Sequence, residues 1–563
     1  MRGRAWEVCA VAVSRETATA CQAPGASGTS RAEPQTPPGS GIPRRCKLLG
    51  GPSGWRRFKD EERNDIRQRA LEPGTHLPVG ENQVNPPLGP RPSADGWRGV
   101  IGDEFTAANA ATVAACILRV VRQAQSCDDL LIGFDGREQG EAAANAVAAA
   151  AQALGVRRNI VVPHLPTPTA THAVRTGAAD AALLITASHN PPNWNGVKAK
   201  VAPGAPLTSE AERRVVELLS GPADPSPPPG DARATTTWKP AADLTDPHVA
   251  AAAALTREPA RRRLRVVVDG LHGVAGTPMA NLCTALGWRP IPVGCQPMPD
   301  FGGLIPDPSS PASRTRAARE VLASGADLGI VLDGDGDRMY VLDERGDSVL
   351  PHELFALLLE HRGADEPTGA ARRVAITVAT GTIVHRVAER LGYEIDEHPI
   401  GFKHLSPLLA QGLAAAACGG VGDLGFAEHG LDRDPFAAVA ALADVLHRTR
   451  APLSVLVDDV RTRNGALRWF ETRVPGSAGP DRLRAIGVRA LAEVLGARPQ
   501  RITEVDGIKC WLGDGQWFLL RPSSTEGGIR LYGELADTPH VAAQLDKLTG
   551  MVRADIGAGP HRK

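Results

Sequence analysis

The feature that most constrains the fold of this chain is an alternation that starts at Ser93. Apolar runs of four to six residues alternate with Ala- and Leu-rich windows of helical length. This order is typical of βαβ units around a mainly parallel sheet. The predicted strands of the first round lie at 130–134, 159–162 and 181–185, and the predicted helices lie at 107–125 and 141–154.

The same pattern recurs further along the chain. One round ends in a predicted strand at 326–332, and another runs from a helix at His352 through the apolar run 374–380. After Ser454 the order changes to a strand, a helix, close strands and a last helix at 538–552. The sequence therefore predicts an α/β protein in which three similar mixed α/β domains precede a smaller α+β C-terminal domain. The predicted limits of these domains are 93–240, 241–346, 347–454 and 455–563.

Residues 1–92 differ from the rest in composition, with clustered Pro, Gly, Ser and Arg and no sustained periodicity. Such composition is typical of disordered chain. We expect a disordered N-terminal extension, or a segment translated from upstream of the true start. A regulatory or targeting arm is the alternative. The Pro-rich stretch 221–231 is a predicted linker between domains.

Composition narrows the possible partners. Lys and Arg total 63, as do Asp and Glu, so no net charge steers the chain toward nucleic acid or an anionic membrane. The nine cysteines are scattered, without CxxC or Cys/His spacing, as expected for free thiols in a reducing cytosol. The sequence has no run of about 18 apolar residues and no signal-type apolar region. We therefore expect a cytoplasmic protein without nucleic-acid or membrane partners.

Ser188 stands shortly after the apolar run 181–185, within Thr-Ala-Ser-His-Asn-Pro-Pro. This position places its hydroxyl at the carboxyl end of a sheet, where ligands bind in open α/β folds. An isolated turn of this kind can equally be a polar strand ending. The segment that follows contains a cationic side chain, Lys198, ten residues after the serine, and this combination favours a functional site.

Three alternate aspartates, Asp333, Asp335 and Asp337, follow another apolar run and are separated by glycines. Their oxygens can turn toward one point, and hard oxygen ligands of this kind suit Mg²⁺. An EF-hand calcium loop is the alternative, with Glu344 at its twelfth position. It is disfavoured because Arg338 takes the place of the required glycine and because both flanks are predicted strands.

A third candidate is the loop Arg-Pro-Ser-Ser-Thr-Glu-Gly-Gly-Ile-Arg at 521–530, between two predicted strands. Two guanidinium groups, three hydroxyls and exposed backbone amides in one turn would make a phosphate cradle. Taken alone, the loop can equally be a solvated hairpin turn. Its distance in sequence from Ser188 indicates a role at the other end of a ligand.

Five segments, in their order along the chain, resemble the α-D-phosphohexomutase superfamily, the phosphoglucomutases and phosphomannomutases. They are SADGWRGVIGDEFT, TASHNPPNWNGVK, DGDGDR, GFKH and RPSSTEGGIR, and the resemblance extends from about Ser93 to the C-terminus. It implies four domains around a central cleft and a reaction in two phosphoryl transfers. Ser188, as phosphoserine, would phosphorylate a sugar monophosphate. The resulting bisphosphate would turn over and return its other phosphate to the serine.

The resemblance also implies the roles of individual residues. One Mg²⁺ per chain would be held by Asp333, Asp335, Asp337 and an oxygen of phosphorylated Ser188. Glucose 1,6-bisphosphate or a similar sugar bisphosphate would act as activator. The remaining catalytic candidates are Lys198, Arg98 and His189, the first two for proton transfer and charge stabilisation. Burial of Lys198 beside other cations is expected to lower its pKa toward that of a useful base.

Contacts to the substrate are implied in the same way. Arg338 and Lys403 would approach the sugar. The phosphate that does not react would be held by Arg521, Ser523, Ser524, Thr525 and Arg530. Two positions of this loop depart from the family pattern, Ser524 for glycine and Gly527 for proline, and neither change is expected to abolish phosphate binding.

The sugar-binding loop at 419–430 departs further, because the usual Glu and Ser are missing. Asp423 is the expected substitute, with Glu428 and His429 as alternatives. The leading hypothesis is a magnesium-dependent mutase that interconverts the 1- and 6-phosphates of glucose or mannose. The alternatives are a phosphoglucosamine mutase and a catalytically weak phosphosugar-binding sensor or regulator. We expect a small-molecule phosphosugar as the partner and a monomer or homodimer.

Overall fold

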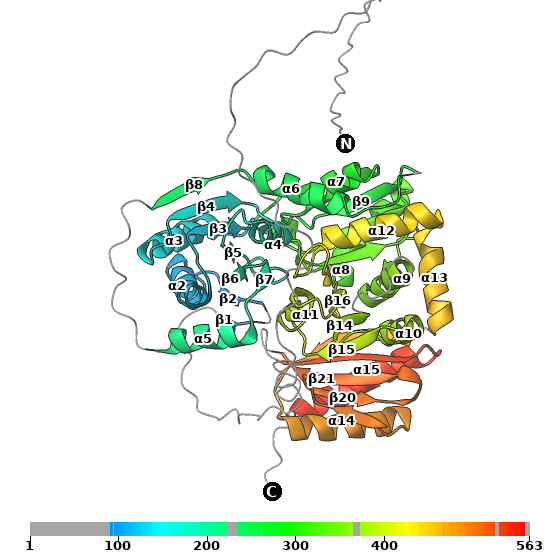
Figure 1. The fold of residues 1–563 in the computed structure, drawn as a ribbon. Helices are drawn as coiled ribbons and strands as arrows, with labels where there is room; N and C mark the ends of the chain where they lie inside the picture. The colour runs from blue at the N-terminus through cyan, green and yellow to red at the C-terminus, as the bar shows by residue number, and fades with distance from the viewer. Residues whose placement is uncertain are drawn as a thin grey trace, which may run out of the picture. The chain divides into compact units, whose positions relative to one another are not determined.

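The structure, a computed structural model, describes residues 91–93, 95–221, 234–260, 262–363, 372–465, 467–523 and 528–557. The expected extension at 1–92, apart from its last two residues, lies outside this part of the chain. The expected linker at 221–231 lies outside it as well, apart from its first residue. Within the described residues the strands form four sheets, one in each successive stretch of the chain (Figure 1).

The first sheet has the strand order β1-β2-β6-β5-β3-β4-β8, with β7 paired to β6. Leu130 and Ile132 of β3 pack with α2 and α3 on one face, whereas Leu131 packs with α4 on the other. This alternation follows from the pleat of a strand, and it buries both faces of the sheet. The strands are β1 (Arg91–Pro92), β2 (Trp97–Val100), β3 (Asp129–Phe134), β4 (Arg158–Pro163), β5 (Ala181–Ile185), β6 (Trp194–Val201), β7 (Ala205–Pro206) and β8 (Thr235–Trp238). The helices are α2 (Ala107–Ala124), α3 (Gly140–Ala153), α4 (Thr167–Arg175), α5 (Ser209–Ser220) and α6 (Ala242–Ala253).

The second sheet has the order β10-β9-β11-β12-β13, and the third has the order β15-β14-β16-β17. The second comprises β9 (Arg265–Asp269), β10 (Arg289–Val293), β11 (Leu328–Leu332), β12 (Met339–Leu342) and β13 (Ser348–Val349), with helices α7 (Gly276–Ala285) and α8 (Pro311–Ser324). The third comprises β14 (Arg373–Thr377), β15 (Glu394–His398), β16 (Ala416–Cys418) and β17 (Leu424–Phe426). Its stretch of chain carries α9 (Pro351–Gly363), α10 (Thr382–Leu391), α11 (Ser406–Ala410), α12 (Pro435–Thr449) and α13 (Leu453–Asn464).

These three sheets repeat one plan. Each contains three adjacent parallel strands followed by an antiparallel one, as in β4-β3-β5-β6, β10-β9-β11-β12 and β15-β14-β16-β17. The loop before the antiparallel strand therefore leaves each sheet at the carboxyl end of its parallel strands. These loops carry Ser188, the three aspartates and residues 419–423, the first part of the expected sugar-binding loop at 419–430. One structural position thus supplies a candidate site segment three times.

The fourth sheet is wholly antiparallel, in the order β18-β22-β21-β20-β19. Its strands are β18 (Leu467–Val474), β19 (Arg501–Thr503), β20 (Ile508–Trp511), β21 (Trp517–Pro522) and β22 (Ile529–Ala536), and its helices are α14 (Pro480–Leu495) and α15 (Val541–Gly557). The prediction of three similar α/β units before a smaller α+β unit is confirmed. The last helix begins and ends later than the predicted 538–552.

Two further findings concern the cysteines and the length of the helices. The six cysteines within the described residues are free and buried. Among the described helices, none has both the length and the apolar content that a bilayer span requires.

Glu534 on β22 joins the fourth unit to the third. Its Oε2 accepts hydrogen bonds from the backbone N–H of Thr382, at the start of α10, at 2.6 Å and from Trp517 Nε1 at 2.8 Å. The side chain is buried. A carboxylate is favourable at a helix N-terminus, because it faces the positive end of the helix dipole and satisfies an N–H group that has no partner within the helix.

We predict that Glu534→Ala lowers the free energy of unfolding by about 1–3 kcal/mol, because two buried donors lose their acceptor. Chemical denaturation of the full chain measures this change. The matched control is Glu493→Ala, on an exposed turn of α14 beside Arg489. It should change the stability by no more than about 0.5 kcal/mol. Equal effects of the two substitutions would contradict the assigned role of Glu534.

Candidate active site

Ser188 lies in the turn between β5 and β6, with its side chain buried. Its φ of 53° is in the left-handed region, which is uncommon for a residue other than glycine. The backbone N–H of Ser188 donates to Thr186 Oγ1 at 2.9 Å. Such a conformation persists only where the surroundings hold it, and it is frequent at functional sites.

Arg137 holds this turn in place, and the sequence analysis did not single it out. Its Nε donates to Asp135 Oδ2 at 3.0 Å. Its terminal nitrogens donate to the backbone carbonyl oxygens of Ser188 (2.6 Å), Pro191 (2.7 Å), Trp194 (2.9 Å) and Asn190 (2.9 Å). A rigid guanidinium with five donors can satisfy so many acceptors at once, whereas an ammonium group cannot. A signal was present in the sequence, because Asp-Gly-Arg directly follows the predicted strand 130–134.

The three aspartates lie between β11 and β12, which pair as antiparallel strands. Strands on both sides exclude the EF-hand alternative, which needs flanking helices. Asp333 Oδ2 accepts a hydrogen bond from Ser188 Oγ at 2.8 Å. A Cβ atom at Gly334 would lie 2.6 Å from the Ser188 carbonyl oxygen. Glycine is therefore required where the aspartate loop approaches the serine turn.

The aspartates fit a hard divalent cation. All three side chains are buried, and one oxygen from each lies within 4.8 Å of the others. Asp335 Oδ1 is buried without a hydrogen-bond partner among the described residues. A buried acceptor of this kind is costly unless a ligand satisfies it. The donor set suits Mg²⁺.

Lys198 on β6 reaches the same group. Its Nζ donates to Asp335 Oδ2 at 2.6 Å and Asp337 Oδ2 at 2.8 Å, and it lies 3.2 Å from Asp95 Oδ2. Burial acts to lower the pKa of Lys198, but the three carboxylates outweigh it and raise the pKa above the ordinary value. The expectation of a lowered pKa is therefore wrong for this arrangement. Lys198 carries its positive charge here.

The aspartates themselves differ in charge state. Burial, and then the charges of Asp337 and Asp335, raise the pKa of Asp333 to about 7. Burial acts in the same direction on Asp337, but the cations Arg433 and Lys198 lower its pKa below the ordinary value. The site thus combines one aspartate that readily takes a proton with another that stays ionised.

Arg433 and Asp95 also belong to this cluster, although neither was among the site residues predicted from the sequence. Arg433 Nη2 lies 2.8 Å from Asp337 Oδ2 and also contacts Asp95. The available signal was the charged triplet Asp-Arg-Asp at 432–434, which stands directly before an apolar helix. Charged residues often precede a helix at the surface of a protein, so this triplet alone is weak evidence for a functional site.

Arg98 on β2 and His189 lie beside the serine. Arg98 Nη1 donates to Asn190 Oδ1 at 2.6 Å and lies 3.4 Å from His189 Nδ1. Burial, followed by the charges of Arg338 and Arg98, lowers the pKa of His189 well below the ordinary value. The imidazole is therefore neutral at physiological pH.

A cavity of about 100 Å³ connects the serine turn with the fourth unit. Arg521 Nε in its wall donates to Asp506 Oδ2 at 2.7 Å, and Arg530 Nη1 donates to Glu471 Oε1 at 3.0 Å. Of the residues expected at the site, the cavity is lined by Arg98, Ser188, His189, Arg338, Asp423, Arg521, Ser523 and Arg530. Ser524 and Thr525 lie outside the described residues.

Lys403 is not among the residues that line this cavity. Its ammonium group pairs with Glu212 of α5, and both residues line a neighbouring cavity. The structure thus brings most of the expected residues together and leaves Lys403 in a separate ion pair.

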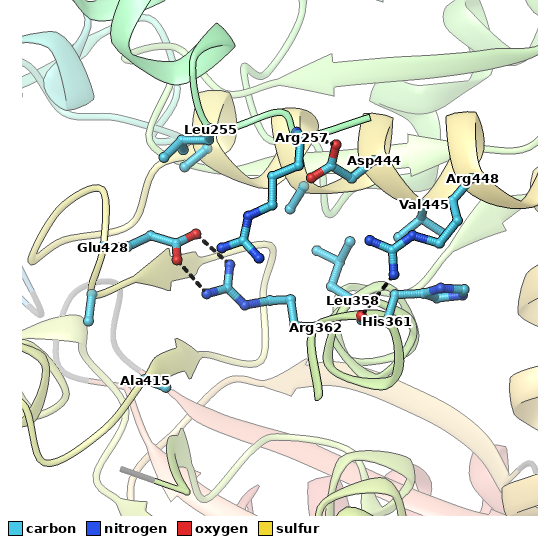
Figure 2. A pocket seen from close by; sticks show the side chains of 13 residues that line it. Leu255, Arg257, Leu358, His361, Arg362, Ala415, Glu428, Asp444, Val445 and Arg448 are labelled. Atoms are coloured by element: carbon cyan, nitrogen blue, oxygen red, sulfur yellow. Dashed lines mark hydrogen bonds and ion pairs between the residues drawn. The ribbon is translucent and has the colours of Figure 1, made fainter. Parts of the chain in front are cut away.

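The three residues that could replace the missing Glu and Ser of the sugar-binding loop lie in different places. Asp423 lines the cavity and accepts a hydrogen bond from the backbone N–H of Val421 at 3.1 Å. Glu428 instead pairs with both terminal nitrogens of Arg362, at 2.7 and 2.8 Å, in a second cavity of about 250 Å³ (Figure 2). His429 is buried against His248 and Asp434. Of these three candidates, Asp423 alone lines the cavity with Ser188 in the described structure.

Comparison with known proteins identifies the family of this chain. Three models of the phosphoglucomutase/phosphomannomutase family match, its alpha/beta/alpha domain I at residues 90–223, domain II at 246–346 and domain III at 351–463. Together these matches cover more than half of the chain. They contain every strand of the first three sheets except β8 and β13.

Individual relatives are distant but match over most of their length. A phosphopentomutase of Thermococcus kodakarensis is 28% identical over 413 residues, which is 72% of this chain and 86% of the relative. A phosphoglucomutase/phosphomannomutase of the same organism is 27% identical over 448 residues, or 78% and 93%. Other relatives are named phosphoglucosamine mutase.

Solved structures share the fold. The crystal structure of a putative phosphomannomutase from Thermus thermophilus matches with a TM-score of 0.68 and 24% identity, over 83% of this chain and 99% of that one. The repeated sheets, the family matches and this structural likeness lead to one assignment. The chain belongs to the α-D-phosphohexomutase superfamily.

Proposed function

We propose that the protein is a magnesium-dependent phosphohexomutase that interconverts the 1- and 6-phosphates of glucose, mannose or both. The reaction runs through phosphorylated Ser188 and a sugar bisphosphate. The observation that carries the proposal is the place of the Ser188 hydroxyl, whose Oγ lies 2.8 Å from Asp333 Oδ2 in a cavity that Arg521 and Arg530 also line. The nucleophile thus contacts the candidate metal site and also shares a cavity with anion-binding side chains.

In the first transfer, a sugar hydroxyl oxygen bonds to the phosphorus of phosphoserine 188 while the bond from phosphorus to Oγ breaks. The hydroxyl proton ends on Oγ. Arg338, whose Nη2 lies 3.4 Å from Oγ, stabilises the charge of the transferred group. Lys198 serves as a fixed positive charge, because its pKa is raised. A bound Mg²⁺ would neutralise charge on the phosphoryl oxygens.

The second phosphate is held at the far side of the cavity. Arg521 and Arg530 are each oriented by a carboxylate, and Ser523 adds a hydroxyl in the same wall. Arginine suits this task because its planar group binds phosphate oxygens in pairs. After the first transfer the bisphosphate turns over, so that its other phosphate faces Ser188 and returns to it.

The sugar meets Asp423 and Val421, which both line the cavity. We propose that Asp423 accepts hydrogen bonds from ring hydroxyls, with His189 and Arg98 orienting the reacting hydroxyl. A phosphoglucosamine mutase is the second candidate, because the carboxylate of Asp423 would also pair with the ammonium group of an amino sugar. We further propose a cytoplasmic protein, monomeric or homodimeric, activated by glucose 1,6-bisphosphate.

We predict that Ser188→Ala reduces turnover by about 10³-fold or more while leaving the circular dichroism spectrum unchanged. The assay follows glucose 6-phosphate formed from glucose 1-phosphate, with Mg²⁺ and a catalytic amount of glucose 1,6-bisphosphate. Ser309→Ala is the matched control, since Ser309 lines the same cavity without an assigned role. Near-normal turnover by Ser188→Ala would exclude Ser188 as the nucleophile.

Arg137→Lys should lower kcat by about 10–100-fold, because lysine cannot hold the four carbonyl groups of the serine turn and a small misplacement of the nucleophile is costly. Arg316→Lys is the control. Arg316 pairs with Asp269 through two nitrogens, at 2.9 and 2.5 Å, in the second unit. If both variants lose the same small fraction of kcat, Arg137 acts on stability alone and the positioning role is wrong.

A panel of 1-phosphates of glucose, mannose and glucosamine tests the sugar assignment. We expect turnover of glucose or mannose 1-phosphate, and a raised KM for that substrate in Asp423→Asn, because an amide carries one acceptor oxygen fewer. Turnover confined to glucosamine phosphate would support the second candidate instead. Measurable binding without any product would indicate the sensor alternative.

A further inference from the structure

A buried group of two histidines and one aspartate lies outside the cavity already described. His248 belongs to α6, His429 to the loop after β17, and Asp434 caps the N-terminus of α12. All three side chains are buried, and none of them lines the cavity that contains Ser188. The mutase reaction proposed above uses none of them, so this polar group needs another explanation.

The ligand atoms of this group face one another. His248 Nε2 lies 2.9 Å from Asp434 Oδ2, His429 Nε2 lies 3.0 Å from the same oxygen, and the two Nε2 atoms are 3.4 Å apart. A tetrahedral Zn²⁺ with bonds of about 2.0–2.1 Å separates its ligand atoms by about 3.3–3.4 Å. The distance between the two nitrogens already equals this spacing, whereas the two nitrogen–oxygen distances would have to lengthen by about 0.3–0.5 Å when an ion binds.

The surroundings orient these ligands. The other oxygen of Asp434, Oδ1, accepts from the backbone N–H groups of Phe436 at 2.8 Å and Ala437 at 3.4 Å, so Oδ2 is directed into the group. His248 Nδ1 lies 3.0 Å from Thr169 Oγ1. Metal-bound histidines commonly bond through their second ring nitrogen in this way, and the Thr169 hydroxyl can accept from Nδ1–H in the tautomer that leaves Nε2 as ligand.

We propose that His248, His429 and Asp434 form a second metal site, separate from the three aspartates beside Ser188. Two imidazoles and one carboxylate favour a borderline ion such as Zn²⁺, whereas the all-oxygen set of the aspartates favours Mg²⁺. His172, whose ring centre lies 5.1 Å from that of His248, packs against the group.

A metal ion bound here would stabilise the backbone around the Ser188 cavity without lining that cavity. It joins α6 to the segment 429–434, and its contact with Thr169 extends it to α4 of the first unit. Arg433, directly beside Asp434, reaches Asp337 at 2.8 Å. A metal ion would therefore fix the backbone that carries Arg433, and it would be a structural ion with a positioning effect.

The test uses the full chain, freed of metal by a chelator, desalted and then titrated with Zn²⁺ and with Co²⁺ as a spectroscopic probe. We expect one equivalent of Zn²⁺ per chain, a rise in the thermal midpoint, and the intense visible bands of tetrahedral Co²⁺. Asp335→Asn, which disables the aspartate site, should keep this equivalent, and His429→Gln should lose it. Thr169→Val should weaken the affinity by about 10–100-fold without abolishing it.

The proposal is wrong if Asp335→Asn binds no Zn²⁺. It is also wrong if His429→Gln still binds the full equivalent of Zn²⁺. X-ray absorption on the zinc-loaded wild-type chain covers the case in which His429→Gln does not fold. Two imidazole nitrogens at about 2.0–2.1 Å support the site, and a shell of oxygen atoms alone contradicts it. Ser188→Ala should bind Zn²⁺ as the wild type does, which separates this result from the proposed mutase activity.

Discussion

The structure depends on three buried carboxylates, one of which, that of Asp333, accepts a hydrogen bond from the Ser188 hydroxyl. Removing a carboxylate from water costs several kcal/mol unless cations and hydrogen bonds compensate it, and three adjacent carboxylates increase that cost. The compensation comes from Lys198 on β6, from Arg338 beside β12 and from Arg433 before α12. Because these cations come from three successive units of the chain, the site can balance its charge only when the units are assembled. Assembly and site formation are therefore one event.

The triplet Asp432, Arg433 and Asp434 shows how closely these contacts are spaced along the chain. Asp432 pairs with Lys200 at 2.6 Å, Arg433 with Asp337 at 2.8 Å, and Asp434 with His248 at 2.9 Å. Three neighbouring residues thus tie the third unit to the first, to the aspartate loop and to α6. The segment leads directly into the first turn of a buried helix, whose N-terminus Asp434 caps. A substitution at any one of the three residues would therefore disturb the ion pairs of the other two.

Much of this architecture could be predicted from the sequence. The strand at 181–185 and the Ser188 turn follow from a run of apolar residues that ends in polar ones, and the structure has β5 at those residues. The apolar runs on both flanks placed the three aspartates between strands. The repeated order of strands also identified three similar units, because each must bury both faces of a parallel sheet.

Other features could not be predicted, because they depend on partners that only the fold brings together. The pKa of Lys198 is raised rather than lowered because Asp335, Asp337 and Asp95 reach it, and Asp95 lies far from it along the chain. The several backbone contacts of Arg137 depend on the left-handed turn at Ser188. Lys403 was expected at the sugar, but its pairing with Glu212 of α5 has no local signal. Sequence patterns are therefore least informative about long-range electrostatics.

We propose above that Ser188 carries the phosphoryl group between the two transfers. Peptide mapping by mass spectrometry tests it most directly, on protein mixed with glucose 1,6-bisphosphate and Mg²⁺ and quenched during turnover. The account predicts one added phosphoryl group, on the peptide that contains Ser188 and at that residue. Turnover with phosphate on another side chain, or on none, would contradict it.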